Sequence, residues 1–466
     1  MRIDRRTLLA GLMGAAFAPS GALADPLAAR PPRRPPADPR LLLARAGLPG
    51  KAGFALIRPG QPTPPQHLAQ ATTPIAPAST VKALTAMYAL DRLGAAHRFR
   101  TRLILAGDML ILAGGGDPTL STDDLGRLAA DLAALGRPMP ARFAVWDGAL
   151  PMLAQIAPEQ AVHLPYNPSI SGMMLNFNRV HLGWSRVGVD YQIGLEARGA
   201  ALSPQAHTIS ARPADQNALF TYREDGAREF WTVSRAALGR QGSRWLPVRL
   251  PALYAGDVFQ TLARARGLAL PAPEVITHLP QGEVLAYHDS VPLDTMIRDM
   301  LRYSTNITAE SLGLHASGAA DLAQSGARML DWLTADDPGL RQGMRLADHS
   351  GLSDASRVSA LSLARILAGP GAETGLPDLL RRNPLQQEAP APEVAAKTGT
   401  LNFVSNLAGY VQGPSGARGA FAILCVDPAR RAAAVGQEQP AGVQGWTRQA
   451  RALQAGLLSA FSAGLG

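Results

Sequence analysis

The sequence predicts an α+β protein in which residues 41–100 and 283–466 form one domain and residues 101–282 form a mostly β insert. Three observations support this division. A helical pattern begins near Ser79, short apolar runs broken by Gly and Pro fill the middle of the chain, and helical patterns followed by strands return after Pro292. At 466 residues the chain is long enough for two or three domains, so this organisation fits its length.

The individual elements are expected in the following order. A strand covers 53–58, and a helix with an apolar face begins near Ser79. Inside the insert, the run from Gly114 to Gly116 lacks the Gly-Lys-Ser/Thr of a phosphate loop, so a tight turn is expected there. The remaining expected elements are insert strands at 103–105, 110–113 and 143–146, one insert helix at 123–135, antiparallel strands at 394–410 and 419–426, and a final amphipathic helix at 447–463.

The composition narrows the classes of function. With 47% hydrophobic and 17% charged residues, the chain is globular rather than disordered. The formal net charge of +9 comes from scattered arginines without a basic block, and only 5% of residues are aromatic, so no nucleic-acid partner is expected. A mildly cationic surface suits an anionic polymer or a membrane surface instead.

The N-terminus is typical of an export signal. Residues 1–24 combine a basic start, a short apolar run and the small-residue pattern Ala22-Leu23-Ala24 of a signal-peptidase site. Arg5-Arg6 fits either a twin-arginine signal or an ordinary secretory signal. Residues 25–40 are rich in Pro and Arg and are expected to be an extended linker. We therefore expect a periplasmic protein with no stable membrane span after cleavage.

Several kinds of catalytic site find no support. Cys425 is the only cysteine and lies in an apolar, strand-like run, so it is expected to be a buried structural thiol, and no disulfide can form within the chain. The nine histidines show no zinc-ligand spacing, and no Gly-x-Ser-x-Gly elbow is present. No metal and no cofactor are therefore expected.

The distribution of lysine points to one candidate site. Only three of the 45 Lys and Arg residues are lysines, namely Lys51, Lys82 and Lys397. An ammonium can lose its proton near neutral pH when it is desolvated, whereas a guanidinium cannot. Two of the three lysines lie in short motifs, and a third motif lies between them; the motifs are Ser79-Thr80-Val81-Lys82, Ser304-Thr305-Asn306 and Lys397-Thr398-Gly399-Thr400.

The first motif pairs a nucleophile with a base. Residues three apart on a helix share a face, so Lys82 can reach the hydroxyl of Ser79 and take its proton if the amine is neutral. Burial and the neighbouring ammonium of Lys397 are expected to lower the pKa of Lys82 as this requires. The alternative is an exposed helix lysine beside an ordinary capping serine.

The other two motifs supply groups for binding and proton transfer. In an extended loop Ser304 and Asn306 would point the same way, the hydroxyl relaying a proton from Lys82 to the leaving amine and the amide holding the substrate backbone; a helix cap is the alternative. Further contributions are expected from the third motif: Lys397 and Thr398 grip a substrate carboxylate, Gly399 leaves room for substrate along the strand edge, and the N–H groups of Thr400 and Ser79 form an oxyanion hole.

In this order, Ser-x-x-Lys, Ser-x-Asn and Lys-Thr-Gly resemble the signature of active-site-serine penicillin-binding proteins and β-lactamases. Over about residue 45 to the C-terminus, the chain closely resembles the D-alanyl-D-alanine carboxypeptidase/endopeptidase family, the class C low-molecular-mass penicillin-binding proteins. Beyond the three motifs, the resemblance rests on Gly116-Asp117-Pro118-Thr119-Leu120, Tyr166-Asn167-Pro168-Ser169-Ile170-Ser171-Gly172, Asn176-Phe177-Asn178-Arg179-Val180 and Ser350-Gly351-Leu352-Ser353.

The resemblance implies a serine β-lactamase/transpeptidase-like domain, with an antiparallel sheet covered by helices and split by the insert. It also implies hydrolysis of D-Ala-D-Ala termini and D-alanyl cross-links of peptidoglycan through an acyl-serine intermediate, with β-lactam antibiotics as inhibitors. Thr305 stands where the family commonly has Asp or Asn. The alternatives are a β-lactamase-like serine hydrolase, which would turn over a cephalosporin rapidly, and a non-catalytic peptidoglycan-binding protein on the same fold.

Overall fold

The computed structural model describes residues 37–60 and 66–466. The predicted export signal, 1–24, and most of the predicted linker, 25–40, lie outside these residues. The last residues of that linker instead begin helix α1 (Pro39–Arg45). This helix starts there because Pro39 suits its first turn and the carboxylate of Asp38 accepts a hydrogen bond from the backbone N–H of Arg40.

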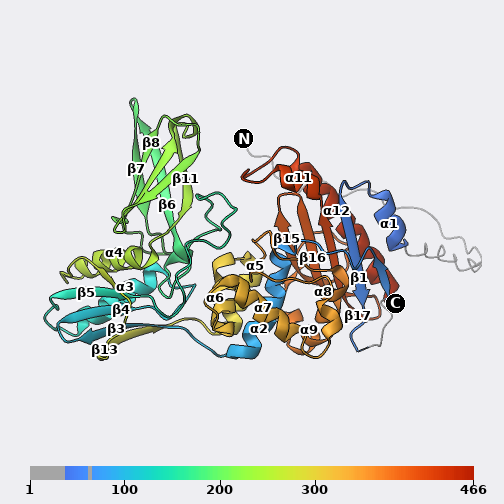
Figure 1. Cartoon of the computed structure of the whole chain (residues 1–466), viewed down its shortest axis with the longest axis horizontal. Helices are drawn as coiled ribbons and strands as arrows, with labels where there is room; N and C mark the ends of the chain where they lie inside the picture. Colours follow the sequence, from blue (N-terminus) through green and yellow to red (C-terminus); the bar gives the residue numbers. More distant parts are fainter. Residues whose placement is uncertain (1–36, 61–65) are drawn as a thin grey trace, which may run out of the picture. The chain divides into compact units, whose positions relative to one another are not determined.

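A six-stranded antiparallel sheet forms the centre of the domain that carries the motifs (Figure 1). The predicted strand at 394–410 is in fact a hairpin, because the chain reverses at Asn402 and Phe403, where Phe403 has a left-handed φ of 55°. The N-terminal strand pairs with the last one, Lys51 opposite Val426, and so joins distant parts of the chain. The strands in sheet order are β14 (Arg381–Arg382), β15 (Val394–Leu401), β16 (Val404–Gln412), β17 (Arg418–Val426), β1 (Lys51–Ile57) and β2 (His67–Ala69).

Helices cover both faces of this sheet, and alternate residues of β17 show how. Ala422 and Leu424 pack toward one group of helices, whereas Phe421, Ile423 and Cys425 pack toward α12 on the opposite face. The predicted α+β fold is confirmed, and Cys425 is buried as predicted. The first group comprises α2 (Val81–Leu93), α5 (Leu293–Tyr303), α6 (Asn306–Ser317), α7 (Leu322–Leu333) and α8 (Ala360–Ala368); α12 is Val443–Gly464, four residues longer at its start than predicted.

The middle of the chain contributes a second sheet, in the strand order β12-β5-β4-β3-β13. Strand β13 (Glu283–Asp289) pairs with β3 (Arg100–Ala106), so this sheet extends past the predicted boundary at 282. Helix α3 (Thr122–Ala134) corresponds to the predicted insert helix, but α4 (Pro251–Arg264), which packs against it, was not predicted. The other strands are β4 (Met109–Ala113), β5 (Arg142–Trp146) and β12 (Glu274–Ile276).

Two three-stranded sheets complete the insert and share one apolar core with α3 and α4. The glycine run before α3 has a packing role, because a Cβ at Gly116, where φ is 74°, would collide with the imidazole of His315 on α6. The glycine run therefore lets the insert approach α6, the helix that begins at the last residue of the second motif. The sheets contain β6 (Arg179–Val187), β7 (Asp190–Glu196) and β11 (Gln241–Pro247), and β8 (Ile209–Ala214), β9 (Phe220–Glu224) and β10 (Glu229–Ser234).

Candidate active site

The first motif lies at the start of the central helix. Ser79 belongs to the 3-10 turn η1 (Ala78–Thr80) and is partly exposed, whereas Lys82, on the first turn of α2, is fully buried. The Nζ atom of Lys82 lies 2.9 Å from the Oγ atom of Ser79, the contact that their spacing predicts. The alternative of an exposed helix lysine is therefore wrong.

Two further acceptors hold the lysine amine. The Nζ atom of Lys82 donates to the side-chain oxygen of Asn306 and to the carbonyl of Ser350, each at 2.8 Å. The Nδ2 atom of Asn306 donates in turn to the carbonyl of Tyr166 at 2.9 Å. Both ends of this amide are therefore engaged by the protein. Asn306 therefore positions the lysine, and because it also lines the cleft, its predicted contact with the substrate backbone stays a prediction.

Ser304 adopts a left-handed conformation. Its φ is 61° and its ψ is 39°, because it ends α5 directly before Asn306 begins α6. The loop is therefore not extended, and the two side chains of the motif reach different lysines. The Nζ atom of Lys397 donates to the Oγ atom of Ser304 and to the carbonyl of Thr398, both at 2.9 Å. A non-glycine residue in this conformation is a kind of strain that recurs at functional sites.

Strand β15 brings the third motif against the first. A Cβ at Gly399 would lie 2.8 Å from the carbonyl oxygen of Pro77 and 3.1 Å from the backbone nitrogen of Ser79. The absent side chain therefore makes room for the segment that carries Ser79, and the predicted space for substrate along the strand edge stays a prediction. Thr398 is half-buried and Thr400 is exposed on the same strand.

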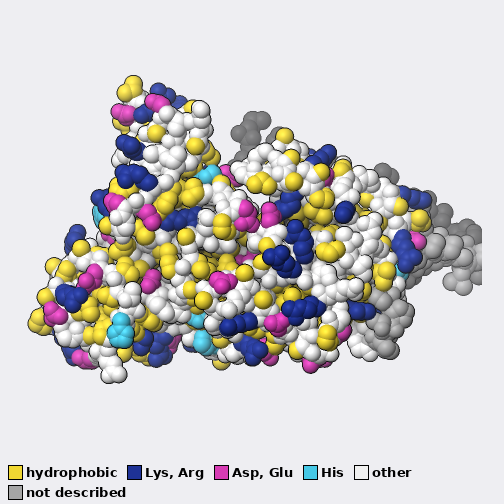
Figure 2. Space-filling view, viewed as in Figure 1, with side chains coloured by type: hydrophobic (Ala, Val, Ile, Leu, Met, Phe, Trp, Pro, Cys, Tyr) yellow, Lys and Arg dark blue, Asp and Glu magenta, His cyan; other side chains and the backbone are white. Residues whose placement is uncertain are grey.

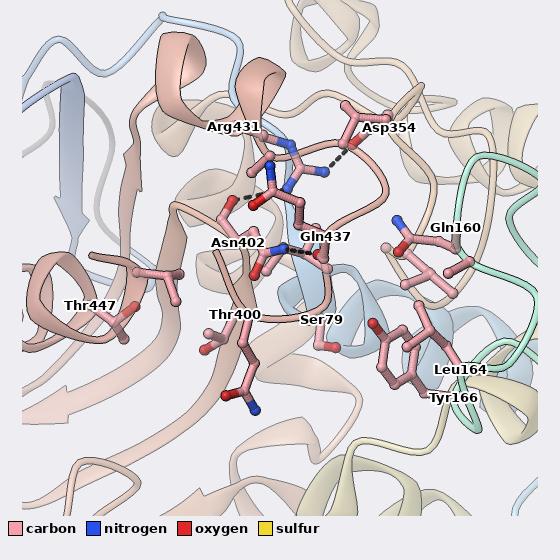
Figure 3. A pocket seen from close by; sticks show the side chains of 18 of the residues that line it. Ser79, Gln160, Leu164, Tyr166, Asp354, Thr400, Asn402, Arg431, Gln437 and Thr447 are labelled. Atoms are coloured by element: carbon pink, nitrogen blue, oxygen red, sulfur yellow. Dashed lines mark hydrogen bonds and ion pairs between the residues drawn. The ribbon is translucent and has the colours of Figure 1, made fainter. Parts of the chain in front are cut away.

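A cleft of about 660 Å³ opens over these residues (Figure 3). It is lined by four predicted residues: Ser79, Ser304, Asn306 and Thr400. Lys82 and Lys397 are buried behind them. Other lining residues were not predicted as site residues; among them are Glu159, Gln160, Leu164 and Tyr166 from the insert, and Asp354, Arg431 and Gln437 from the domain of the central sheet.

Burial dominates the electrostatics of the two lysines. It lowers the pKa of Lys82 to about 7, although the nearby carboxylates of Glu310 and Asp348 oppose this shift. The pKa of Lys397 is also well below its usual value. Burial is the largest cause, and repulsion from Lys82 is the next. Because charge repulsion is mutual, loss of a proton from one amine favours the charged form of the other. Lys82 is thus able to exist as a neutral base near neutral pH.

Two acids beneath Lys82 had not been predicted. The carboxylate of Glu310 accepts hydrogen bonds from the backbone N–H groups of His349, at 2.9 Å, and Ser350, at 2.8 Å. It therefore fixes the backbone that leads into Ser350, the residue whose carbonyl accepts from Lys82. Asp348 accepts from the N–H of Ser353 and from another buried serine nearby. Glu310 follows Asn306 by one helical turn, and this spacing is the only signal in the sequence that could have indicated it.

The described ranges, 37–60 and 66–466, contain no cluster of His, Cys, Asp or Glu arranged to hold a metal. None of the helices in these ranges has the length and apolarity needed to cross a bilayer. Figure 2 shows the basic side chains of one face spread among acidic and apolar ones.

Comparison with known proteins shows what this site belongs to. The profile of the D-Ala-D-Ala carboxypeptidase 3 (S13) family matches residues 65–450. The chain belongs to this family. The carboxypeptidase is 30% identical over 390 residues to a D-alanyl-D-alanine carboxypeptidase of Actinomadura sp. strain R39, covering 73% of this chain and 71% of the relative. It is 27% identical over 187 residues to the D-alanyl-D-alanine carboxypeptidase DacB of Haemophilus influenzae, covering 36% and 39%.

Solved structures give the same result for the fold of the carboxypeptidase. The crystal structure of penicillin-binding protein 4 from Haemophilus influenzae matches with a TM-score of 0.70 at 20% identity, covering 90% of this chain and 98% of that one. The family profile and the Actinomadura relative confirm the family predicted from the sequence, and the protein is a serine-type D-Ala-D-Ala carboxypeptidase. The alternative of a non-catalytic binding protein is wrong.

Proposed function

We propose that the carboxypeptidase removes terminal D-alanine from peptidoglycan stem peptides and also cleaves D-alanyl cross-links, both through an acyl-serine intermediate on Ser79. The contact between the buried amine of Lys82 and the hydroxyl of Ser79, 2.9 Å at the floor of an open cleft, carries this proposal. We further propose that β-lactams acylate the same serine. The related penicillin-binding protein 4 has been solved in complex with a β-lactam, which supports this.

Acylation needs two proton transfers, one from the hydroxyl of Ser79 and one to the leaving amine. Neutral Lys82 takes the proton of Ser79 as Oγ bonds to the substrate carbonyl carbon, and the N–H groups of Ser79 and Thr400 stabilise the oxyanion. The C–N bond then breaks as Lys397 gives a proton, through the hydroxyl of Ser304, to the leaving amine. In the second half of the reaction, water attacks the acyl-serine and passes a proton through Ser304 back to Lys397. Lys82 returns its proton to the Oγ atom of Ser79 as the shortened peptide is released.

The second amine also serves binding. Lys397, with Thr398, provides a cation and a hydroxyl on the edge of β15 for the terminal carboxylate of the substrate. We propose that this contact holds the carboxylate beside the scissile bond and so aligns the substrate for attack by Ser79.

The cellular location and the domain boundaries are proposed from the sequence and the sheets. The sequence of residues 1–24 fits an export signal, residues 25–40 a tether, and the substrate proposed lies outside the cytoplasm. We propose a periplasmic enzyme whose catalytic domain, 41–100 and 283–466, is split by the insert at 101–282. We place the C-terminal boundary of the insert after β13, because that strand pairs with β3 in the sheet of the insert.

The function is tested on purified cell-wall fragments by mass spectrometry before and after incubation. Loss of terminal D-alanine and of cross-links is expected, together with a stable adduct between the wild-type protein and labelled penicillin. Absence of all three reactions would refute the proposed function. Rapid turnover of a chromogenic cephalosporin, in place of slow adduct decay, would instead favour the β-lactamase-like alternative.

The rate of acylation by penicillin is expected to rise with pH through about 7. Burial lowers the pKa of Lys82 to about 7, so below that pH the amine is protonated and cannot accept the proton of Ser79. Above it the amine is neutral and the rate reaches a plateau. The second-order acylation rate, measured between about pH 5.5 and 9, checks this. A rate that falls as pH rises through this range would contradict the assignment of Lys82 as the base.

Glu310→Gln is expected to shift that pH profile to lower pH and to lower its plateau by about tenfold. Burial raises the pKa of the Glu310 carboxyl to about 8, and its ionised form raises the pKa of Lys82. Removing this acid therefore removes the charge that favours protonated Lys82, and the amine becomes neutral at lower pH. Glutamine also offers only one acceptor oxygen to the N–H groups of His349 and Ser350, which costs about 1–3 kcal/mol of unfolding free energy. Acylation rates across pH and a denaturant titration measure the two effects.

A purely structural role for Glu310 would lower stability and leave the midpoint of the pH profile unchanged. The exposed Glu283 provides the control, because it pairs with Arg137 at 2.7 Å on the sheet of the insert. Glu283→Gln should leave both the midpoint and the plateau as in the wild type.

A further inference from the structure

A contact between the insert and the domain of the central sheet lies next to residues that line the cleft. The catalytic-domain segment 434–442 connects α11 (Pro428–Ala433) to α12, and several of its residues line the cleft. Glu438, in the middle of this segment, reaches the insert. Both of its carboxylate oxygens lie 2.9 Å from the same Nη2 atom of Arg244, on strand β11.

The insert side of this contact is firmly held. The guanidinium of Arg244 lies 5.3 Å from the ring centroid of Phe220, and the ring of His163 stacks on the same phenylalanine at 5.2 Å. The Nε2 atom of His163 lies 3.5 Å from the carboxylate of Glu438. Phe220 belongs to the apolar core of the insert. The cation that meets Glu438 is therefore anchored by packing, and does not sit at the end of a free side chain.

The segment that carries Glu438 is held less firmly. Gly436 and Gly442 have φ values of 76° and 79°, and Val435 is 61% exposed. The neighbouring Gln437 is tied by its backbone carbonyl, which accepts a hydrogen bond from Asn402 at 2.8 Å within its own domain. Among the described residues, the ion pairs between this segment and the insert are those of Glu438. Loss of the Glu438 side chain would therefore remove the ion pairs that hold segment 434–442 to the insert.

We propose that Glu438 is a specificity-determining residue that holds segment 434–442 against the insert beside the cleft, and so favours terminal D-alanine over cross-linked substrates. The argument rests on the proposed function. A terminal substrate loses one alanine, whereas a cross-link carries a second stem peptide that must leave the cleft. While Glu438 and Arg244 are in contact, no peptide can pass between segment 434–442 and the insert at this point.

Glu438→Ala is expected to raise cross-link cleavage relative to D-alanine release from a pentapeptide by at least about threefold. Backbone amide exchange within 434–442 should become at least about fivefold faster, since the segment has lost its tie to the insert. The double variant Arg244→Glu/Glu438→Arg restores an ion pair and should return both quantities toward the wild-type values. Glu283→Ala, which breaks an exposed Arg–Glu pair away from the cleft, should change neither.

The two readouts separate failure of this proposal from failure of the proposed function. Unchanged amide exchange in Glu438→Ala would overturn the proposal, whether or not the wild type releases D-alanine. So would a cleavage ratio within twofold of the wild type in an active protein. If Glu438→Ala does not fold, Glu438→Gln replaces it, because the amide keeps the volume and loses the charge. A wild type that neither releases D-alanine from the pentapeptide nor cleaves the cross-link counts against the proposed function alone.

Discussion

Ser79→Ala is expected to keep the fold and to lose both the stable penicillin adduct and D-alanine release, the latter by at least about 10⁴-fold. The hydroxyl removed is the only one that Lys82 contacts in the described residues, at 2.9 Å. Without it the carbonyl carbon has no protein nucleophile, and the oxyanion hole alone gives only weak catalysis. Gel detection of labelled penicillin and chromatographic assay of D-alanine measure the two losses.

The control for this variant is Ser459→Ala. Ser459 is exposed on α12 and donates only to the carbonyl of Ala455 in the same helix, so its loss should change neither adduct nor release. The melting temperature of Ser79→Ala should stay close to that of the wild type, because Ser79 is only partly buried. A penicillin adduct of normal yield on Ser79→Ala would show that another residue is the nucleophile.

The sequence predicted the local part of this site well. Ser79 and Lys82 are three residues apart, and a helix fixes their contact whatever the rest of the chain does. The scarcity of lysine drew attention to Lys82 and Lys397, and both are buried. The hydrogen bond between Lys397 and Ser304 spans 93 positions, so it could be expected only from the order of the motifs and the family resemblance.

Three kinds of contact at the site could not be predicted, for physical reasons. Nothing local shows that the amide of Asn306 would accept a hydrogen bond from Lys82, 224 positions away. The close approach of the Ser79 segment to Gly399 was also missed, since a sequence does not show which neighbour takes the place of a missing side chain. Glu310 and the pair of Arg244 with Glu438 were missed because an acid gains meaning only from its distant partners.

The fold shows the same limit. Periodicity located the helix at 123–135 and the strands around it, yet helix α4 went unnoticed, although Pro251 at its first turn is a typical start signal. The hairpin of β15 and β16 was interpreted as one strand, because Asn402 and Phe403 are not the glycines or prolines that usually mark a tight turn. At the start of α4 and at the reversal between β15 and β16, the residues that begin or end an element were harder to interpret than the periodicity of the apolar residues.

Lys82→Arg is expected to lower the second-order rate of penicillin acylation by about 10³-fold or more at every pH. A guanidinium stays protonated throughout the accessible pH range, so it cannot take the proton of Ser79 however close it lies. The pH-dependent rise through about 7 should vanish with it, because that rise reports the amine of Lys82. Stopped-flow measurement of adduct formation from about pH 5.5 to 9 tests both expectations.

Because Lys82 is fully buried, the larger arginine is also expected to cost about 1–3 kcal/mol of unfolding free energy, and this could be mistaken for the cause of the lost rate. Lys82→Met separates the two effects, since it keeps a long, unbranched side chain but has no amine, and it should lose acylation to the same extent. Lys51→Arg, at the exposed start of β1, is the matched neutral substitution. An acylation rate for Lys82→Met within tenfold of the wild type would mean that some group other than this amine accepts the proton of Ser79.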